Sequence, residues 1–352
     1  MENIEIKFYQ LLNKDLASQW KEFEKNSDHY YFQTYEWQKN WYYQIIKYKK
    51  NFKVFVIIIK KNNTPIILLP MCIQKIFCFK ILKWSGFPFS DYNAPLIKKD
   101  LIINKNEFFE IFNLIIRKYK NLFNCINLIN QPFNINKTVN PFTVFFKNYE
   151  LNKYYRINFN KNFQINEKEN KDLNYQIKRL KKLGNVQFHL ATKKKDIKKI
   201  INFIIKNKSI QYDRTKAWNL FKLNTFKLIF ILINLKSMSR YITYLTLDKK
   251  IIAAHSGFIY NKRCYYLFPA YDYYFRKFAA GKILLDFIYK DCIRKNCDYL
   301  DLTIGSEQYK VKWSNEISTS NNYLKSISTI GYIYILLIKF KNYLKKKNDN
   351  RS

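Results

Sequence analysis

The chain has 352 residues, 48% of them hydrophobic and 18% aromatic, so it is long enough for about two domains and too apolar for a disordered protein. Its formal net charge of +37 would by itself suit a nucleic-acid-binding protein. Only nine of the 63 basic residues are Arg, however, and the basic residues are spread over every segment. This pattern favours the codon usage of an AT-rich genome over a nucleic-acid site, although such a charge still attracts phosphates and acidic membranes.

Cysteine usage and the length of the apolar runs indicate the compartment. The six cysteines form no Cys-x-x-Cys pair and lie mostly in apolar runs, a pattern typical of buried free thiols in a reducing compartment. The acidic N-terminus has no apolar secretory segment, and no apolar run reaches the roughly 18 to 20 residues of a membrane-spanning helix. We therefore expect a cytoplasmic protein without a metal cofactor.

The first half of the chain alternates helical and strand patterns. Apolar spacings of three and four predict helices, and β-branched runs predict strands. Pro70 interrupts one of these runs and marks an edge or a bulge. The expected elements, in order, are helices at 14–24 and 34–48, strands at 54–59 and 66–73, an ordered loop at 84–96, a helix at 107–119, a strand at 125–129, a loop at 131–141 and a strand at 154–159.

The second half predicts a strand meander with flanking helices. A domain boundary is expected between Lys147 and Tyr155, which gives domains at 1–150 and 151–328 and a basic tail at 329–352. The expected elements are helices at 173–183, 195–206 and 282–294 and strands at 186–191, 241–247, 251–260, 264–271 and 298–303. Both halves contain a strand, a Lys-rich turn and a strand after helices, which either a duplication or chance could produce.

A glycine-bearing loop, Arg276-Lys-Phe-Ala-Ala-Gly281, precedes the predicted helix at 282–294. A helix N-terminus offers unpaired N–H groups and a partial positive charge, so it can bind phosphate, and a glycine lets a pyrophosphate approach the backbone. The pattern is equally that of an amphipathic helix with a glycine at its start. A phosphate site at this loop is therefore one of two interpretations.

Several side chains with acid–base chemistry follow in the same half. His255 lies on a strand with small neighbours and could be a general base or a core residue. Asp301 lies between two leucines on a strand, so it needs either a partner or an edge position. Glu307 and Lys310 could form an exposed helical ion pair, and Tyr309 could donate a proton to a thiolate or pack in a core.

With these residues in view, the chain resembles the CelD-like (cellulose-biosynthesis type) acyltransferases of the GNAT superfamily, relatives of the FemABX peptidoglycan transferases. The resemblance covers about residues 30 to 315. Its motifs are Phe32-Gln-Thr-Tyr-Glu-Trp37, Ser90-Asp-Tyr-Asn-Ala-Pro-Leu96, Gln131-Pro132, Asn140-Pro141, Ala253-Ala-His-Ser-Gly257, Pro269-Ala-Tyr-Asp272 and Asp301-Leu-Thr-Ile-Gly-Ser-Glu-Gln-Tyr-Lys310.

The resemblance implies a mixed-sheet α/β fold of two tandem GNAT-like domains, with an acyl-CoA (acetyl-CoA) site in the second and a first domain without catalytic function. The superfamily's pyrophosphate loop is Gln/Arg-x-x-Gly-x-Gly/Ala, and Ala279 departs from it at the first glycine. It also implies direct acyl transfer to an amine or hydroxyl of a cell-envelope or polysaccharide precursor. The expected CoA-binding residues are Arg276, Ala279, Ala280, Gly281 and Lys282; the catalytic candidates are His255, Glu307, Tyr309 and Asp301; the acceptor-binding candidates are Asp272 and Lys310.

The acceptor class stays open among glycans, lipids and amines. One alternative is a Fem-like transferase that uses aminoacyl-tRNA, which would give the positive charge a role, whereas the main hypothesis needs no nucleic acid. Another is a non-catalytic, envelope-associated protein of the same fold. The tail combines an apolar stretch, 332–338, with lysines from Lys339 onward, so it either packs on the protein or lies on an anionic membrane, at the inner face in a cytoplasmic protein.

Overall fold

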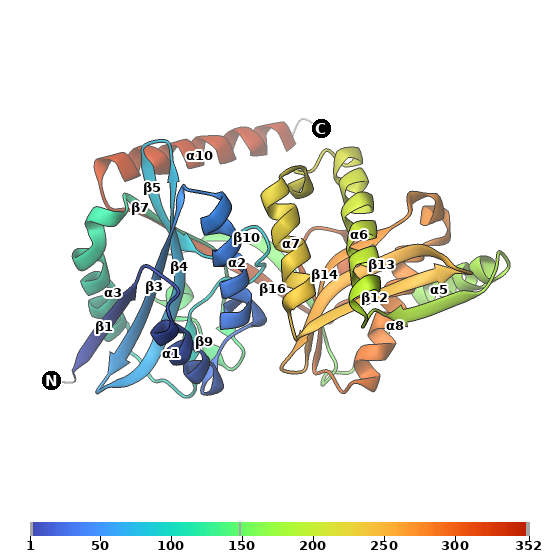
Figure 1. The fold of residues 1–352 in the computed structure, drawn as a ribbon, viewed down its shortest axis with the longest axis horizontal. Helices are drawn as coiled ribbons and strands as arrows, with labels where there is room; N and C mark the ends of the chain where they lie inside the picture. The colour runs from blue at the N-terminus through green and yellow to red at the C-terminus, as the bar shows by residue number, and fades with distance from the viewer. Residues whose placement is uncertain (1–2, 148, 350–352) are drawn as a thin grey trace. The chain divides into compact units, whose positions relative to one another are not determined.

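The structure, a computed structural model, describes residues 3–147 and 149–349, with side chains placed except at 149–151 and from 341 onward. The expected boundary region includes residue 148, and the expected tail includes residues 350–352; these positions lie outside the described residues. The chain forms two compact units, one of Met1–Asn152 with Thr319–Ser352 and the other of Lys153–Ser318. Each unit is a mixed α/β structure (Figure 1).

The first unit is built on a mixed sheet with the strand order β1-β3-β4-β5-β7-β16. Neighbouring strands are antiparallel except β5 and β7, which are parallel. Short strands β2 (Ser27–Asp28) and β6 (Leu96–Lys98) extend it beside β4, and β8 (Asn134–Ile135) pairs with β9 (Thr138–Val139). The remaining elements are β1 (Ile4–Tyr9), α1 (Lys14–Lys25), α2 (Tyr35–Tyr48), β3 (Phe52–Lys61), β4 (Thr64–Ile76), β5 (Phe79–Trp84), α3 (Lys105–Tyr119), β7 (Cys125–Pro132), α4 (Pro141–Val144), β16 (Glu316–Ser326) and α10 (Thr329–Asp349).

The second unit has the strand order β11-β12-β13-β14-β15-β10. Again all neighbours are antiparallel except one parallel pair, β14 and β15. In Figure 1, α6 and α7 cross the face of this sheet that is turned to the viewer. The elements are β10 (Tyr149–Asn158), α5 (Glu167–Lys181), β11 (Val186–Leu190), α6 (Lys194–Arg214), α7 (Asn224–Lys236), β12 (Arg240–Leu247), β13 (Lys250–Tyr260), β14 (Arg263–Tyr271), α8 (Ala280–Arg294), β15 (Tyr299–Ile304) and α9 (Gln308–Lys312).

The two units repeat one element order: a strand, two helices, three antiparallel strands, a helix and a parallel strand. The predicted fold class, a mixed α/β fold in two tandem units, is therefore confirmed. In each unit, the last strand of this order has a second neighbour that comes from outside the repeat. Strand β10, which follows the first unit, pairs with β15, and β16, which follows β15, pairs with β7. Each unit thus completes its sheet with a strand from beyond its own repeat.

Apolar faces of these elements form a separate core in each unit. In the second unit, α8 contributes Ile283, Leu284 and Ile288, which pack with α5 and the central strands around the fully buried Trp313. In the first, α3 packs its apolar face on β3, β4 and β7. The cysteines are unpaired and, except for Cys78, buried. No helix in the described ranges has the length and apolarity needed to traverse a bilayer.

The structure corrects the sequence interpretation at several elements. Strands β1, β5 and β16 and helix α7 had not been predicted. Pro70 lies on β4, which is a central strand rather than an edge. It is tolerated there because β4 changes partner at this point, from β6 at Ile67–Leu68 to β5 at Met71–Ile76.

Candidate acyl-CoA site

A cavity of about 410 Å³ lies within the second unit. Its walls come from α6, from β14, from the turn and first residues of α8, and from the segment after β15. All five expected CoA-binding residues and two of the four expected catalytic residues therefore line one cavity. The lining residues are Lys208, Gln211, Tyr266, Pro269, Tyr271, Arg276, Ala279, Ala280, Gly281, Lys282, Leu285, Glu307 and Tyr309.

Helix α8 begins at the cavity without a capping side chain. Its N-cap is Ala279, whose side chain cannot accept a hydrogen bond from the first-turn N–H groups, although its carbonyl accepts those of Lys282 and Ile283. Ala279 has φ +52° and ψ +37°, the left-handed conformation that glycine adopts without strain. This explains why the superfamily motif has glycine at that position. The packing around Gly281 is also close, because a Cβ there would lie 3.1 Å from the Tyr271 ring.

The two basic residues of this turn differ in their partners. Lys282 donates to Glu169 at 2.7 Å, so its charge is already balanced by a buried carboxylate of α5. The exposed Arg276 donates at 3.2 Å to the Tyr273 hydroxyl and, within the described residues, has no acidic partner. A second hollow, of about 380 Å³, shares Arg276 with the cavity and also contains Arg214, whose guanidinium lies 3.5 Å from the centre of the Tyr273 ring. Two guanidinium groups are therefore available to an anion here.

Glu307 and Tyr309 reach the cavity from the segment between β15 and α9. Glu307 is half-exposed and pairs with Lys310 at 3.2 Å. Its side chain folds over Gly305, where an added Cβ would overlap the carboxylate. Burial raises the pKa of Tyr309 well above its usual value, so the phenol keeps its proton. The cavity therefore contains a carboxylate and a neutral proton donor.

From α6 the structure adds two cavity residues that the sequence did not predict, Lys208 and Gln211. Lys208 is only 8% exposed, and desolvation lowers its pKa to about 8. The predicted helix ended at residue 206, so these positions were missed. A sequence signal existed, because Lys208 continues the buried stripe of Ile197, Ile201 and Ile204 at helical spacing.

His255 does not line the cavity. It lies on β13 with no exposed surface, and its ring stacks on Tyr266 with centroids 4.6 Å apart. A Cβ on Gly257 would come within 2.7 Å of the imidazole, so the bulge at this glycine makes room for the ring. Burial lowers the pKa of His255 to about 3, which keeps the imidazole neutral at physiological pH.

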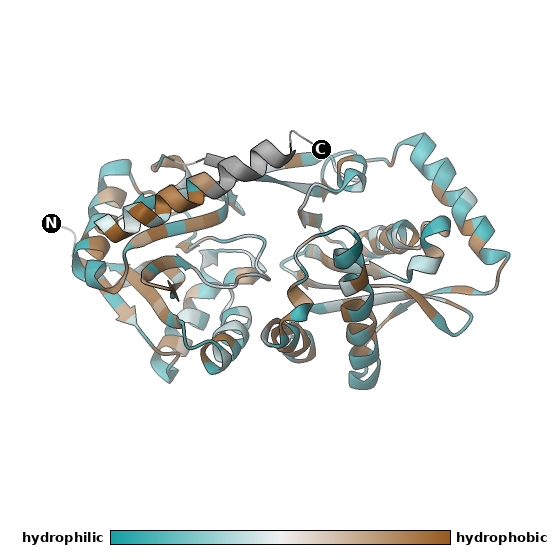
Figure 2. Ribbon diagram, turned by 90° about the horizontal axis from the view of Figure 1, so that it is seen from above, coloured by the Kyte–Doolittle hydropathy of each residue, from teal (hydrophilic) through white to brown (hydrophobic). Residues whose placement is uncertain are grey.

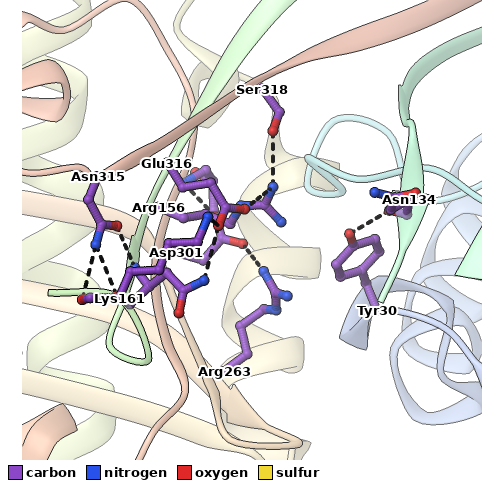
Figure 3. A network of polar contacts seen from close by, with 11 residues as sticks. Tyr30, Asn134, Arg156, Lys161, Arg263, Asp301, Asn315, Glu316 and Ser318 are labelled. Atoms are coloured by element: carbon purple, nitrogen blue, oxygen red, sulfur yellow. Dashed lines mark hydrogen bonds and ion pairs between the residues drawn. The ribbon is translucent and has the colours of Figure 1, made fainter. Parts of the chain in front are cut away.

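Asp301 also lies outside the cavity lining, in a polar network on β10, β14, β15 and β16 (Figure 3). Its carboxylate pairs with Arg263 at 2.8 Å, and these two side chains are 0% and 7% exposed. The other carboxylate oxygen accepts the Thr303 N–H at 3.0 Å. Beside it, Arg156 pairs with Glu316 at 2.8 Å. Asp301 thus has the partner that its apolar flanks require.

The two expected acceptor-binding residues have structural contacts. Asp272 caps the 3-10 turn Tyr273–Phe278 through the Tyr274 N–H and pairs with Lys250 at 3.2 Å. Lys310 is buried and donates at 2.7 Å to the Ile304 carbonyl, in addition to its pair with Glu307. Neither residue is part of the cavity lining. Among the described residues no group of His, Cys, Asp and Glu side chains could hold a metal ion.

Comparisons with known proteins identify the type of domain. Residues 167–311 match the family model described as "Acetyltransferase (GNAT) domain". No curated protein sequence matches the chain. Solved structures match over most of its length, with identities low enough that they show the fold alone. A conserved protein of unknown function from Bacteroides thetaiotaomicron has 13% identity and a TM-score of 0.56, covering 92% of this chain and 99% of its own.

Two further matches have assigned names. A structure of FemX has 9% identity and a TM-score of 0.55, with 92% of this chain and 96% of that one covered. The structure of L-PGS from Bacillus licheniformis has 9% identity and the same TM-score, with 93% and 96% covered. The segment of the second unit that matches the GNAT acetyltransferase model includes the whole cavity lining. Such a match supports an acyltransferase.

Proposed function

We propose that the second unit transfers an acyl group from acyl-CoA, acetyl-CoA or a longer homologue, to an amine or hydroxyl of a cell-envelope or polysaccharide precursor. One observation carries the proposal: the uncapped start of α8 opens into the same cavity that Glu307 and Tyr309 line. The pyrophosphate would bind to the N–H groups of Ala280 and Gly281, with Arg276 beside them; the Ala279 N–H already donates to the Arg276 carbonyl. Lys282 helps to hold the turn through Glu169.

The remaining cavity residues supply acid–base chemistry for direct transfer. The acceptor nitrogen or oxygen attacks the thioester carbonyl, and Glu307 takes its proton. The C–S bond then breaks, and Tyr309 protonates the departing thiolate. Glu307 is preferred to His255 as the base because the imidazole is buried outside the cavity lining. Asp301 would have a positioning role, because its pair with Arg263 holds strand β15, which leads into the segment that carries Glu307 and Tyr309.

The first unit has the same element order but a different helix start, and we propose that it is not catalytic. Its α3 is capped by Asn104, whose side chain accepts the Glu107 N–H. The preceding residues 99–104 contain no glycine or alanine. This cap satisfies one of the first-turn N–H groups that a pyrophosphate would need. The proposed domains are those expected from the sequence, 1–150, 151–328 and a tail at 329–352.

The proposed acceptor class rests on the resemblance of this chain to known proteins. Within the superfamily, the CelD-like motifs favour a polysaccharide or envelope precursor, and the names FemX and L-PGS are compatible with an envelope acceptor. Two alternatives have distinct outcomes. An RNA that co-purifies with the protein and is released by salt would favour aminoacyl-tRNA as the donor. Failure to bind acetyl-CoA would favour a non-catalytic protein of this fold.

The test measures binding and turnover separately. Calorimetry should show one acetyl-CoA site, and thiol release should depend on an acceptor from a panel of amino sugars, diamines and sugar hydroxyls. Glu307→Gln and Tyr309→Phe should each lower turnover by ~10²-fold or more and leave acetyl-CoA affinity within about twofold. The exposed residues Glu167 and Tyr175 provide matched controls as Glu167→Gln and Tyr175→Phe. Unchanged turnover in both cavity variants would refute the assignment.

We propose further that the protein works in the cytoplasm in peripheral contact with an anionic membrane, through α10. Figure 2 shows this helix as mostly hydrophobic along its described part. Its inner face seats Ile335 and Gly331 against the first unit; a Cβ on Gly331 would overlap the Asn124 carbonyl. The opposite face carries exposed apolar side chains at helical spacing: Ile333, Leu336, Leu337 and Phe340 are 47% to 61% exposed.

The positive charge of the chain favours an anionic membrane over a second copy of the protein as the partner of this apolar face. The helix sequence continues with Lys341, Lys345, Lys346 and Lys347, and a second copy of a chain with net charge +37 would be repelled. The double variant Leu336→Gln with Leu337→Gln should therefore lose co-sedimentation with vesicles containing phosphatidylglycerol. The exposed Phe133 provides a control as Phe133→Gln. Equal partition of all variants, or dimers without vesicle binding, would dismiss the membrane role.

A further inference from the structure

Among the described residues, the buried cation Lys208 has no anionic partner. Its side chain lines the cavity, yet within the described part of the chain it forms no hydrogen bond and no ion pair. Its recorded contact is with the Tyr212 ring, whose centre lies 5.4 Å from Nζ. Burial of an ammonium without an anion is costly, so such a group marks a place where an anion is expected to bind.

The neighbouring charges do not supply that anion. The Glu307 carboxylate is 3.2 Å from Lys310, which is itself buried, so this acid already has a cation. Glu307 raises the pKa of Lys208 and Lys310 lowers it, but desolvation is the largest effect and brings the value to about 8. At pH 7 the ammonium form therefore predominates. The group of three charges has one positive charge in excess.

The surroundings of Lys208 suit an oxyanion. Gln211 lies three residues further along α6, lines the same cavity, and has no side-chain hydrogen bond among the described contacts. Its amide can donate beside the ammonium. The phenol rings of Tyr266 and Tyr309 and the side chain of Leu285 form much of the remaining wall. A charge pair in such a low-dielectric space is stronger than one in water.

We propose that Lys208, with Gln211, binds a carboxylate or phosphate of the acceptor, so that the enzyme acts on acidic acceptors. This inference rests on the proposed function, because it assigns the cavity to two substrates. Arg276, beside Tyr273 at the start of α8, faces the CoA phosphates, and Lys208, beside Glu307, holds the acceptor. Acceptors of this class include amino acids, sugar acids and sugar phosphates with a free amine or hydroxyl.

The experiment measures anion binding directly and needs no identified acceptor. Inorganic phosphate and acetate are titrated in separate arms by calorimetry at constant ionic strength, into protein saturated with CoA so that the pyrophosphate site is filled. Wild type should bind one of the two anions at a single saturable site. Lys208→Met should weaken this binding ~10-fold or more, since hydrogen bonds to charged groups are worth about 1.5–3 kcal/mol. Lys206→Met, at an exposed position two residues away, is the matched control.

The outcomes separate this inference from the proposed function. If both anions bind Lys208→Met as tightly as wild type, or if CoA removes the site, the acceptor-anion role of Lys208 is overturned. If CoA does not bind at all, the proposed function fails, and the same titrations in its absence still decide whether Lys208 holds an anion. Lys208→Arg, which keeps the charge, should retain binding if Lys208→Met proves unstable.

Discussion

The buried pair of Asp301 and Arg263 separates a structural carboxylate from a catalytic one. In Asp301→Asn the shape of the side chain is kept, and the carboxylate charge that pairs with the 7% exposed Arg263 is removed. Breaking a buried pair in this way costs about 3–5 kcal/mol. With a urea m-value of about 2 kcal/mol/M, the unfolding midpoint should fall by roughly 1.5–2.5 M. Far-UV circular dichroism during urea unfolding measures this shift.

Two controls test the cause of that loss. Asp298→Asn, a half-buried carboxylate near the start of the same strand, should change stability by less than about 0.5 kcal/mol. Adding Arg263→Met to Asp301→Asn removes both charges and should recover much of the loss. Acetyl-CoA affinity of the folded single variant should stay within about twofold, because Asp301 does not line the cavity. An unchanged midpoint, or a double variant weaker than the single one, would refute the reasoning.

Three further predictions concern a turn, a glycine and an acid. Ala279→Gly should raise the free energy of unfolding by about 0.5–1 kcal/mol, which is the strain of a left-handed alanine less the greater chain entropy of glycine. Ala280→Gly, inside the helix, should lower this free energy. Both are measured by urea unfolding, and an equal loss of stability in the two variants would contradict the strain at Ala279. Gly305→Ala should lower turnover ~10-fold or more at unchanged acetyl-CoA affinity, because the added Cβ displaces the Glu307 carboxylate. Full activity of this variant would show that Glu307 is not the base. Burial raises the pKa of Glu24 to about 7, so its protonated form stabilises the fold below about pH 4.5, and this stability is lost as pH rises through 7. The free energy of unfolding of Glu24→Gln should therefore exceed that of wild type by on the order of 1–3 kcal/mol at pH 8 and by little at pH 4.5. Urea unfolding across this pH range measures the difference, and a difference that does not grow with pH would contradict the raised pKa.

Periodic apolar patterns predicted most of the fold, and its gaps have physical causes. Helix α7 was missed because Asn224–Lys236 is apolar on nearly all sides, which hides the helical period. Strand β16 was missed because Glu316–Ser326 is rich in Ser and Asn, whose polar side chains bond to a long-range partner. Such a strand is specified by its neighbour rather than by its own alternation.

The candidate site was partly predictable for a similar reason. The turn before α8 and the segment after β15 are local patterns, and both could be found in the sequence. The separation of Asp301 from Glu307 could not, because it depends on Arg263, which comes from another strand. His255 had the chemistry of a base, but its burial beneath Tyr266 is a tertiary property. Lys208 could be predicted as a cavity residue only if α6 was known to extend to Arg214.

The repeat of one element order in two units shows how little of the proposed chemistry comes from the fold itself. Both units place a helix after three antiparallel strands, and in both its first turn needs acceptors for its N–H groups. In α3 the Asn104 side chain provides one for the Glu107 N–H. In α8 the cap is an alanine in a left-handed conformation, and the acceptor has to come from elsewhere. A strained, uncapped turn beside a cavity is less stable than the capped alternative in the same chain, and a bound pyrophosphate would supply both the missing acceptors and the compensating energy.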